Sequence, residues 1–88
     1  MKYKYKYIIK EDIIGRIATN FVFKINEIKG SIFITNINKL SCNAKSLIGI
    51  LSLHLKKGEE VEVLVLDTED YKSIKKIFEE IGDEINGL

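Results

Sequence analysis

The pattern of apolar and polar residues changes period several times along the chain, and each change marks an expected element. Residues 2–9, KYKYKYII, alternate lysine with tyrosine and end in two isoleucines. A period of two is that of a β-strand, because successive side chains point to opposite faces of the sheet. We therefore expect a strand with Tyr5, Tyr7 and Ile9 toward a core and the lysines toward water.

A helix is predicted next, over residues 16–29. Its apolar side chains recur every three or four positions, as on one face of a helix: Ile17, Phe21, Ile25 and Ile28. Gly30 follows at a position where a left-handed residue commonly ends a helix. No serine or aspartate stands at the start of the helix to cap it.

The middle of the chain is predicted to form short strands around one short helix. β-Branched and aromatic residues favour the strands, and a tight turn at Asn38-Lys39 would join the first two. The expected elements are a strand at 31–37, a return strand at 40–42, a helix at 45–53 and a valine-rich central strand at 60–66.

A longer amphipathic helix is expected after the last of these strands. Asp67 and Thr68 are good N-capping residues, and apolar positions then recur at helical spacing as far as Ile85. Gly82 interrupts this helix late. The order strand, helix, strand, strand, helix, strand, helix predicts an α+β fold with one sheet and its helices on one face.

Length and composition exclude several classes of protein. Eighty-eight residues without a linker or repeat predict a single domain over residues 1–88. Fourteen basic and thirteen acidic side chains give a formal net charge of +1, which argues against a role in neutralising nucleic-acid backbones. No apolar run is long enough to span a bilayer or to form a signal peptide, so we expect a cytoplasmic protein that binds neither nucleic acid nor membrane. The single cysteine, Cys42, cannot form an internal disulfide, and the sequence has no metal or cofactor motif.

Residues 43–58, NAKSLIGILSLHLKKG, contain most of the candidate chemistry. Ser46 stands at the start of the short helix, where its hydroxyl would accept a backbone N–H and where a phosphate would meet the positive helix terminus. The apolar residues after it exceed what one buried face can hold. Leu47, Ile48 and Leu51 share one side, and Ile50 and Leu53 lie toward another. We expect one of the two sets to be exposed, as at a partner-binding surface.

Two further features each have a structural and a functional interpretation. His54 is the only histidine, and no cysteine or carboxylate at a catalytic spacing supports a role in catalysis, so we favour a surface position. The interleaved lysines and tyrosines of residues 2–7 could bind single-stranded nucleic acid by stacking. Because a strand places these two residue types on opposite faces, protection of a sheet edge by lysine is the favoured interpretation.

The chain resembles a known family over nearly its whole length. NAKSLIGILSL, the following KKGEEVEVLV and the closing amphipathic helix are similar to the HPr family, the small phosphocarrier proteins of the bacterial sugar phosphotransferase system. The resemblance implies an open-faced β-sandwich of four antiparallel strands with three helices on one face. It also implies that Ser46, within A-K-S-L, matches a regulatory phosphorylation site and that Leu47, Ile48 and Leu51 match an exposed docking patch.

The family's other phosphorylation site is altered at the matching positions. Family members carry a histidine at the start of the first helix, in a pattern like G-[IL]-H-A-R-P-A, whereas this chain has G-R-I-A-T-N-F from Gly15 to Phe21. The resemblance puts Ile17 at the phosphohistidine position and Thr19 at that of the arginine. Isoleucine has no nitrogen nucleophile, and threonine cannot neutralise a phosphate as a guanidinium does.

Three functions follow as hypotheses. The first is a regulatory HPr-like protein without catalytic or phosphocarrier activity, which binds partners through Leu47, Ile48 and Leu51 and is switched by phosphorylation of Ser46. The partners that the resemblance implies are enzyme I, HPr kinase or a transcription regulator. The second is an active phosphocarrier that uses His54, which stands where the family usually has glycine, in a turn that the family fold places close to the first helix. The third is a plain interaction domain with the same fold and no link to the phosphotransferase system.

Overall fold

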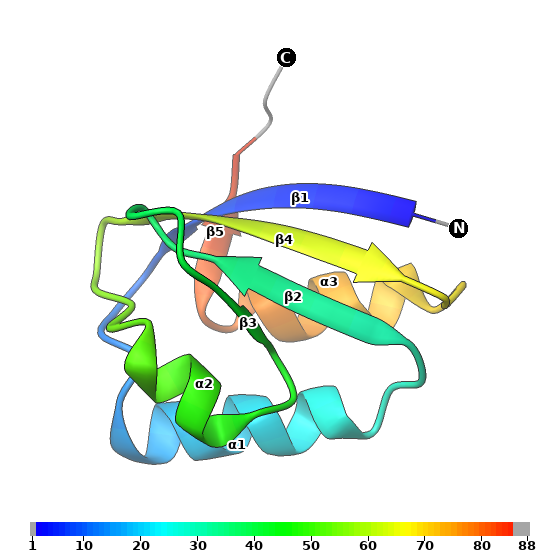
Figure 1. The fold of residues 1–88 in the computed structure, drawn as a ribbon, viewed down its shortest axis with the longest axis horizontal. Helices are drawn as coiled ribbons and strands as arrows, with labels where there is room; N and C mark the ends of the chain where they lie inside the picture. Colours follow the sequence, from blue (N-terminus) through cyan, green and yellow to red (C-terminus); the bar gives the residue numbers. More distant parts are fainter. Residues whose placement is uncertain (1, 86–88) are drawn as a thin grey trace.

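An antiparallel sheet with helices covering one of its faces forms the fold of the computed structural model, which describes residues 2–85 (Figure 1). The strands are β1 (Lys2–Ile9), β2 (Ser31–Thr35), β3 (Ser41–Asn43), β4 (Glu60–Leu66) and β5 (Gly82–Glu84), and the helices are α1 (Gly15–Asn26), α2 (Leu47–Ser52) and α3 (Tyr71–Glu79). The strand order is β3-β2-β4-β1-β5. The predicted α+β class and open-faced arrangement are confirmed.

Strand β4 lies at the centre of the sheet, as its valine content predicted. It pairs antiparallel with β1 on one side and with β2 on the other, so that Val63 is opposite both Tyr5 and Ile34. Side chains alternate between the helix-covered face and the open face along both β1 and β4. Tyr7 and Ile9 are almost completely buried and Tyr5 packs against the core, which confirms the predicted orientation of β1.

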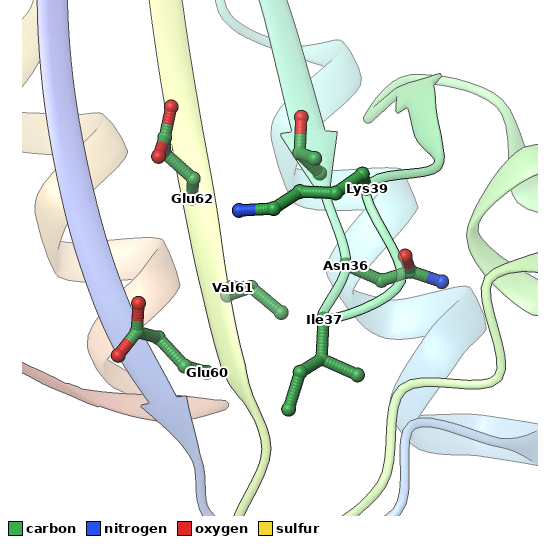
Figure 2. Close-up of a pocket in the computed structure, with 7 residues that line it drawn as sticks. Asn36, Ile37, Lys39, Glu60, Val61 and Glu62 are labelled. Carbon is green, nitrogen blue, oxygen red and sulfur yellow. The ribbon is translucent and has the colours of Figure 1, made fainter.

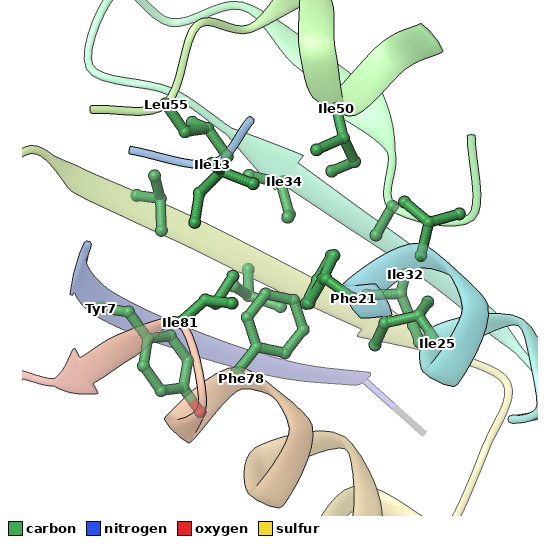
Figure 3. Close-up of a cluster of buried hydrophobic side chains, with 14 of the residues drawn as sticks. Tyr7, Ile13, Phe21, Ile25, Ile32, Ile34, Ile50, Leu55, Phe78 and Ile81 are labelled. Carbon is green, nitrogen blue, oxygen red and sulfur yellow. The ribbon is translucent and has the colours of Figure 1, made fainter. Parts of the chain in front are cut away.

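The hydrophobic core fills the space between the sheet and the three helices (Figure 3). Phe21 of α1 meets Phe78 of α3 edge to face, with ring centroids 5.0 Å apart. Phe78 also stacks on Tyr7 of β1 at 5.3 Å. These aromatic contacts join both long helices to the sheet, because each ring is contributed by the apolar face of a different element.

The last segment of the chain differs from the prediction. The helix predicted to continue to Ile85 ends at Glu79, and Gly82–Glu84 form β5 against Tyr7–Ile9 of β1. The sheet therefore has five strands instead of the four expected. A Cβ at Gly82 would lie 2.9 Å from the carbonyl oxygen of Ile8, so the residue that was taken to interrupt a helix permits the close approach of two strands.

Several element boundaries also differ from those predicted. Helix α1 ends at Asn26, and Gly30 lies four residues further on, at φ +107°, in the connection to β2. The predicted cap Asp67 has φ +60°, and the Oγ1 of Thr68 accepts the N–H of Asp70, so both residues shape the turn before α3 rather than its first turn. The remaining elements agree with the predicted ranges to within two residues. None of the helices in the described part of the chain is long and apolar enough to cross a membrane.

Candidate functional site

Ser46 occupies the N-cap position of α2, as the sequence predicted. Its backbone is extended, and its Oγ accepts the N–H of Gly49 at 3.0 Å. A Cβ at Gly49 would lie 3.0 Å from the Cβ of Cys42 and 3.3 Å from the Cβ of Ser46. The first turn of α2 therefore packs closely on β3, and burial raises the pKa of the half-buried Cys42 thiol.

The segment before Ser46 is held in place by two asparagine side chains. The Oδ1 of Asn43 accepts the N–H of Lys45 at 2.8 Å, and the Nδ2 of Asn26 on α1 donates to the carbonyl of Lys45 at 3.0 Å. The ammonium of Lys45 donates to the carbonyl of Ile28, near the end of α1. Lys45 is thus adjacent to Ser46 in sequence, but its charge is directed toward α1.

The apolar residues of α2 divide into an exposed and a buried set. Ile48 is 82% exposed and Leu51 40% exposed, whereas Leu47 is half-buried and packs against the core. Ile50 and Leu53 are buried. The prediction that one set would be exposed is confirmed for Ile48 and Leu51, and Leu47 lies at the border between the two sets.

Phe23 is an exposed aromatic residue that the sequence analysis did not identify. It lies on α1 and is 72% exposed. It precedes Asn26 by three positions, so it shares a face of α1 with the residue that contacts the start of α2. Its exposure could have been predicted from its position, because Phe23 falls outside the helical spacing that contains Phe21 and Ile25.

Ile17 lies in the first turn of α1, where the resemblance placed the family's histidine. It is half-buried and packs against the core. With Asn20 and Lys24 of the same helix it lines a shallow pocket of about 150 Å³, whose other side includes Glu80. The Nζ of Lys24 and the Oε1 of Glu80 are 2.6 Å apart, and this ion pair joins the two sides of the pocket.

The two polar residues near Ile17 differ in how their side chains are held. The Oγ1 of Thr19 donates to the carbonyl of Arg16 at 3.1 Å, so the hydroxyl is turned toward its own helix. Arg16 is exposed and, within residues 2–85, makes no ion pair. Helix α1 begins after Ile14 without a side-chain cap.

His54 follows α2 in a left-handed backbone conformation, with φ +51°. Its N–H donates to the carbonyl of Leu51 at 3.3 Å, which is typical of the residue that ends a helix. The next residue, Leu55, accepts the N–H of Ile13 at 3.0 Å, so this turn lies beside the segment that leads into α1. The imidazole is exposed, and no hydrogen bond or ion pair of its ring is found among residues 2–85.

A second pocket, of about 190 Å³, lies at the β2–β3 turn and the start of β4 (Figure 2). Figure 2 shows the Lys39 side chain reaching across toward Glu62, with Glu60 and Ile37 further along the pocket. None of the predicted site residues lines it. In the described part of the chain, no three His, Cys, Asp or Glu side chains are grouped so that they could hold a metal ion.

Comparisons with known proteins point to one family. Residues 3–81 match PTS-HPr, described as the PTS HPr component phosphorylation site. A comparison with curated proteins gives no match. The structure is similar to the phosphocarrier protein HPr from Bacillus anthracis, with a TM-score of 0.83, 21% identity and coverage of 91% of this chain and 96% of that protein.

Two further solved structures have the same fold. HPr-C-His from Thermoanaerobacter tengcongensis gives a TM-score of 0.74 at 25% identity, with coverage of 92% of this chain and 90% of that one. A histidine-containing phosphocarrier protein of Mycoplasma gives 0.71 at 19% identity, with coverage of 90% and 89%. These matches extend over nearly all of each chain, so the similarity concerns the whole architecture rather than one motif.

Proposed function

This chain belongs to the HPr family of the phosphotransferase system, and we propose that it is a regulatory member that binds partner proteins and carries no phosphoryl group at the start of α1. The observation that carries the proposal is the juxtaposition at α2 of a serine cap and exposed apolar residues. Ser46 accepts the N–H of Gly49, and Ile48, two residues later in the chain, is 82% exposed.

The proposed docking surface is the α2 patch, which consists of Leu47, Ile48 and Leu51. Binding of a partner over the exposed isoleucine and leucine of this short helix would be favourable in free energy, because it removes apolar surface from water. Phe23 is exposed on the face of α1 that carries Asn26, which bonds to the residue before Ser46, and we include it in the proposed surface because aromatic residues are enriched at interfaces. Enzyme I, HPr kinase or a transcription regulator is the proposed partner, and the protein acts in the cytoplasm without catalytic activity of its own.

Phosphorylation of Ser46 is the proposed switch. A phosphate on Oγ would place negative charge at the positive end of α2, where the fold tolerates it. The ammonium of Lys45 donates a hydrogen bond to the carbonyl of Ile28. It could neutralise the added phosphate charge only if this hydrogen bond were broken. The phosphate charge would therefore interact with a partner protein bound at Ile48. It would favour partners with a complementary charge and so change which partner binds.

The absence of a nucleophile at position 17 supports the second half of the proposal. Ile17 has no atom that can accept a phosphoryl group, and the hydroxyl of Thr19 is bonded to the carbonyl of Arg16. The alternative is a phosphocarrier that uses His54. One observation favours it: the hydrogen bond from Ile13 to Leu55 brings the His54 turn beside the start of α1.

Labelling with phosphoenolpyruvate separates these two functions. The full chain and its His54→Ala variant would each be incubated with enzyme I and radiolabelled phosphoenolpyruvate, with an ordinary HPr as the positive control. We expect label on the control and on neither form of this chain. Label on the wild type that is lost in His54→Ala would overturn the proposal and support the alternative.

Binding measurements test the α2 patch and the switch. Ile48→Asp is expected to weaken binding to enzyme I or HPr kinase by at least about tenfold, since it places a charge at the centre of an apolar contact. Leu40→Asp is the matched control, because Leu40 is also exposed, at 58%, but lies outside the patch. HPr kinase is expected to label the wild type and not Ser46→Ala. An absence of both binding and labelling would favour an interaction domain without a phosphotransferase role.

A further inference from the structure

Within residues 2–85, the first half of β1 has one edge that is not paired with another strand. Strand β5 pairs with Tyr7–Ile9 only, whereas β4 pairs with β1 over nearly its whole length on the other side. Among the residues that the structure describes, no strand pairs with the β5 side of residues 2–5. We call this segment the β1 edge. Unpaired strand edges are ready templates for another strand.

The backbone groups that face this edge follow from one hydrogen bond. The N–H of Ile85 donates to the carbonyl of Lys6 at 2.8 Å, so the backbone of Lys6 faces the β5 side. Along a strand, the N–H and C=O groups of alternate residues point to the same side. The backbone groups of Lys2 and Lys4 therefore point outward at the β1 edge, where a further strand could bond to them.

Aromatic side chains lie on the helix-covered side of the β1 edge. The rings of Tyr3 and Tyr5 are nearly parallel, with centroids 6.4 Å apart, and Tyr71 at the start of α3 lies 5.2 Å from Tyr3. The Nζ of Lys75 lies over the ring of Tyr5 at 5.3 Å and is 3.1 Å from Glu84. The three tyrosines form a partly exposed shelf on which apolar side chains could pack.

Cationic side chains lie on the open side of the same edge. Lys2 and Lys4 are exposed, and within residues 2–85 neither has a carboxylate at ion-pair distance, whereas Lys6 is 3.9 Å from Glu60. Pairing of the β1 edge with a second copy of itself would bring these lysines opposite one another, and like charges directly opposite destabilise a sheet. The charge of the edge thus disfavours self-association and favours an anionic strand.

We propose that the β1 edge binds an extended acidic segment of a partner protein by β-strand addition. Acidic side chains at alternate positions of that segment would meet Lys2 and Lys4, and their backbone groups would bond to those of the same lysines. The intervening apolar side chains would pack on Tyr3, Tyr5 and Tyr71. Main-chain hydrogen bonds supply affinity in this mode of recognition, and alternate side chains supply specificity. The β1 edge is separate from the α2 patch. Helix α2 packs on β3, and β3 and β1 lie on opposite sides of the central strand β4.

A capped synthetic peptide, Val-Glu-Val-Glu-Val-Glu-Val, tests the proposal on the full chain labelled with ¹⁵N. Titration is expected to shift the amide resonances of residues 2–5 and to protect the N–H of Lys4 from hydrogen exchange. In antiparallel pairing, the glutamate N–H groups would face β1 and the valine N–H groups would face away. Methylation of the glutamate nitrogens should therefore abolish binding, and methylation of the valine nitrogens should leave it within about twofold.

Charge-reversal variants of the β1 edge provide a second test of the proposal. The double variant Lys2→Glu/Lys4→Glu is expected to bind the peptide about tenfold more weakly, and Lys57→Glu, at an exposed lysine of the turn before β4, is expected to bind it normally. Circular dichroism would check that both variants are folded. Binding that survives methylation of the glutamates, or that is unchanged in the double variant, would overturn the proposal. So would tighter binding of an oligothymidine to the same residues, because the edge would then be a general polyanion site.

Discussion

The side-chain amide of Asn36 joins the β2–β3 turn to the end of α2 by donating to the carbonyl of Leu53 at 3.0 Å, although 17 residues separate the two. Asn36 is only 6% exposed. Its Oδ1 accepts the N–H groups of Asn38 and Leu40, each at 3.0 Å. One buried polar side chain therefore satisfies three backbone groups and holds the turn that leads into His54.

Asn36→Ala is expected to destabilise the protein by about 2–3 kcal/mol, because it leaves buried backbone groups without partners. Urea unfolding followed by circular dichroism would measure the loss. Asn38→Ala is the control: its side chain is exposed, and its N–H would keep the bond to Asn36. Equal stabilities of the two variants would show that water replaces the amide of Asn36.

Ser46 can be tested in the same way for its structural role. Ser46→Ala removes the acceptor of the Gly49 N–H and is expected to cost about 1 kcal/mol of stability. Ser46→Asp keeps an acceptor and adds a charge that suits the start of a helix, so we expect it to lie within about 0.5 kcal/mol of the wild type. Ser52→Ala, near the end of α2, is the serine control. A Ser46→Asp variant as unstable as Ser46→Ala would contradict the cap and the tolerance of phosphate there.

The features that sequence predicted correctly are those set by neighbouring residues. The alternation of β1 and the valines of β4 require only that one face of a strand be buried, and the cap at Ser46 depends on a backbone N–H three residues away. Strand β5 could not be found in this way. Ile81 and Ile85 are spaced as in a helix, and the need for glycine at position 82 arises from the backbone of Ile8, which is remote in sequence.

In the candidate site, too, features set by neighbouring residues could be predicted, and features set by tertiary packing could not. The apolar excess of α2 predicted an exposed set, but the division between half-buried Leu47 and exposed Ile48 depends on how the helix lies on α1 and the sheet. The exposure of Phe23 was missed for a similar reason, since an aromatic residue beside an apolar stripe can widen the buried face or leave it. The β1 edge depends on where β5 stops, which no local pattern of KYKYKY records.

Tyr7 carries the one buried side-chain oxygen or nitrogen in residues 2–85 that has no hydrogen-bond partner. Removing an unsatisfied polar atom relieves a desolvation cost, so Tyr7→Phe is expected to be neutral or to stabilise the protein by up to about 1 kcal/mol. Chemical denaturation at pH 7 would measure the change. A loss above about 1 kcal/mol would mean that the hydroxyl is hydrogen-bonded in solution.

The same variant tests the effect of alkaline pH. Burial, with the nearby Glu84 and Glu79 carboxylates, raises the pKa of Tyr7 well above its ordinary value. Above pH about 10 the unfolded chain releases this proton while the folded chain retains it, so stability falls as the pH rises, and below that pH the group has no effect. In Tyr7→Phe this alkaline loss should be smaller, and what remains is attributable in part to Tyr5, whose pKa is also raised by burial. Identical slopes in both proteins would exclude Tyr7 as a cause.

Gly30 and Gly58 form a matched pair for testing how close the turn after β4 lies to the start of β2. Both have positive φ angles, +107° and +88°, so alanine would be strained at either position. A Cβ at Gly30 would lie 2.8 Å from both the carbonyl oxygen of Leu66 and the Cβ of Thr68, whereas nothing lies within 4 Å at Gly58. We expect Gly58→Ala to cost about 1–2 kcal/mol from strain alone and Gly30→Ala to cost about 1–3 kcal/mol more from the clash. Urea unfolding of the two variants would measure the difference, and equal losses would show that the Leu66–Thr68 segment can move aside.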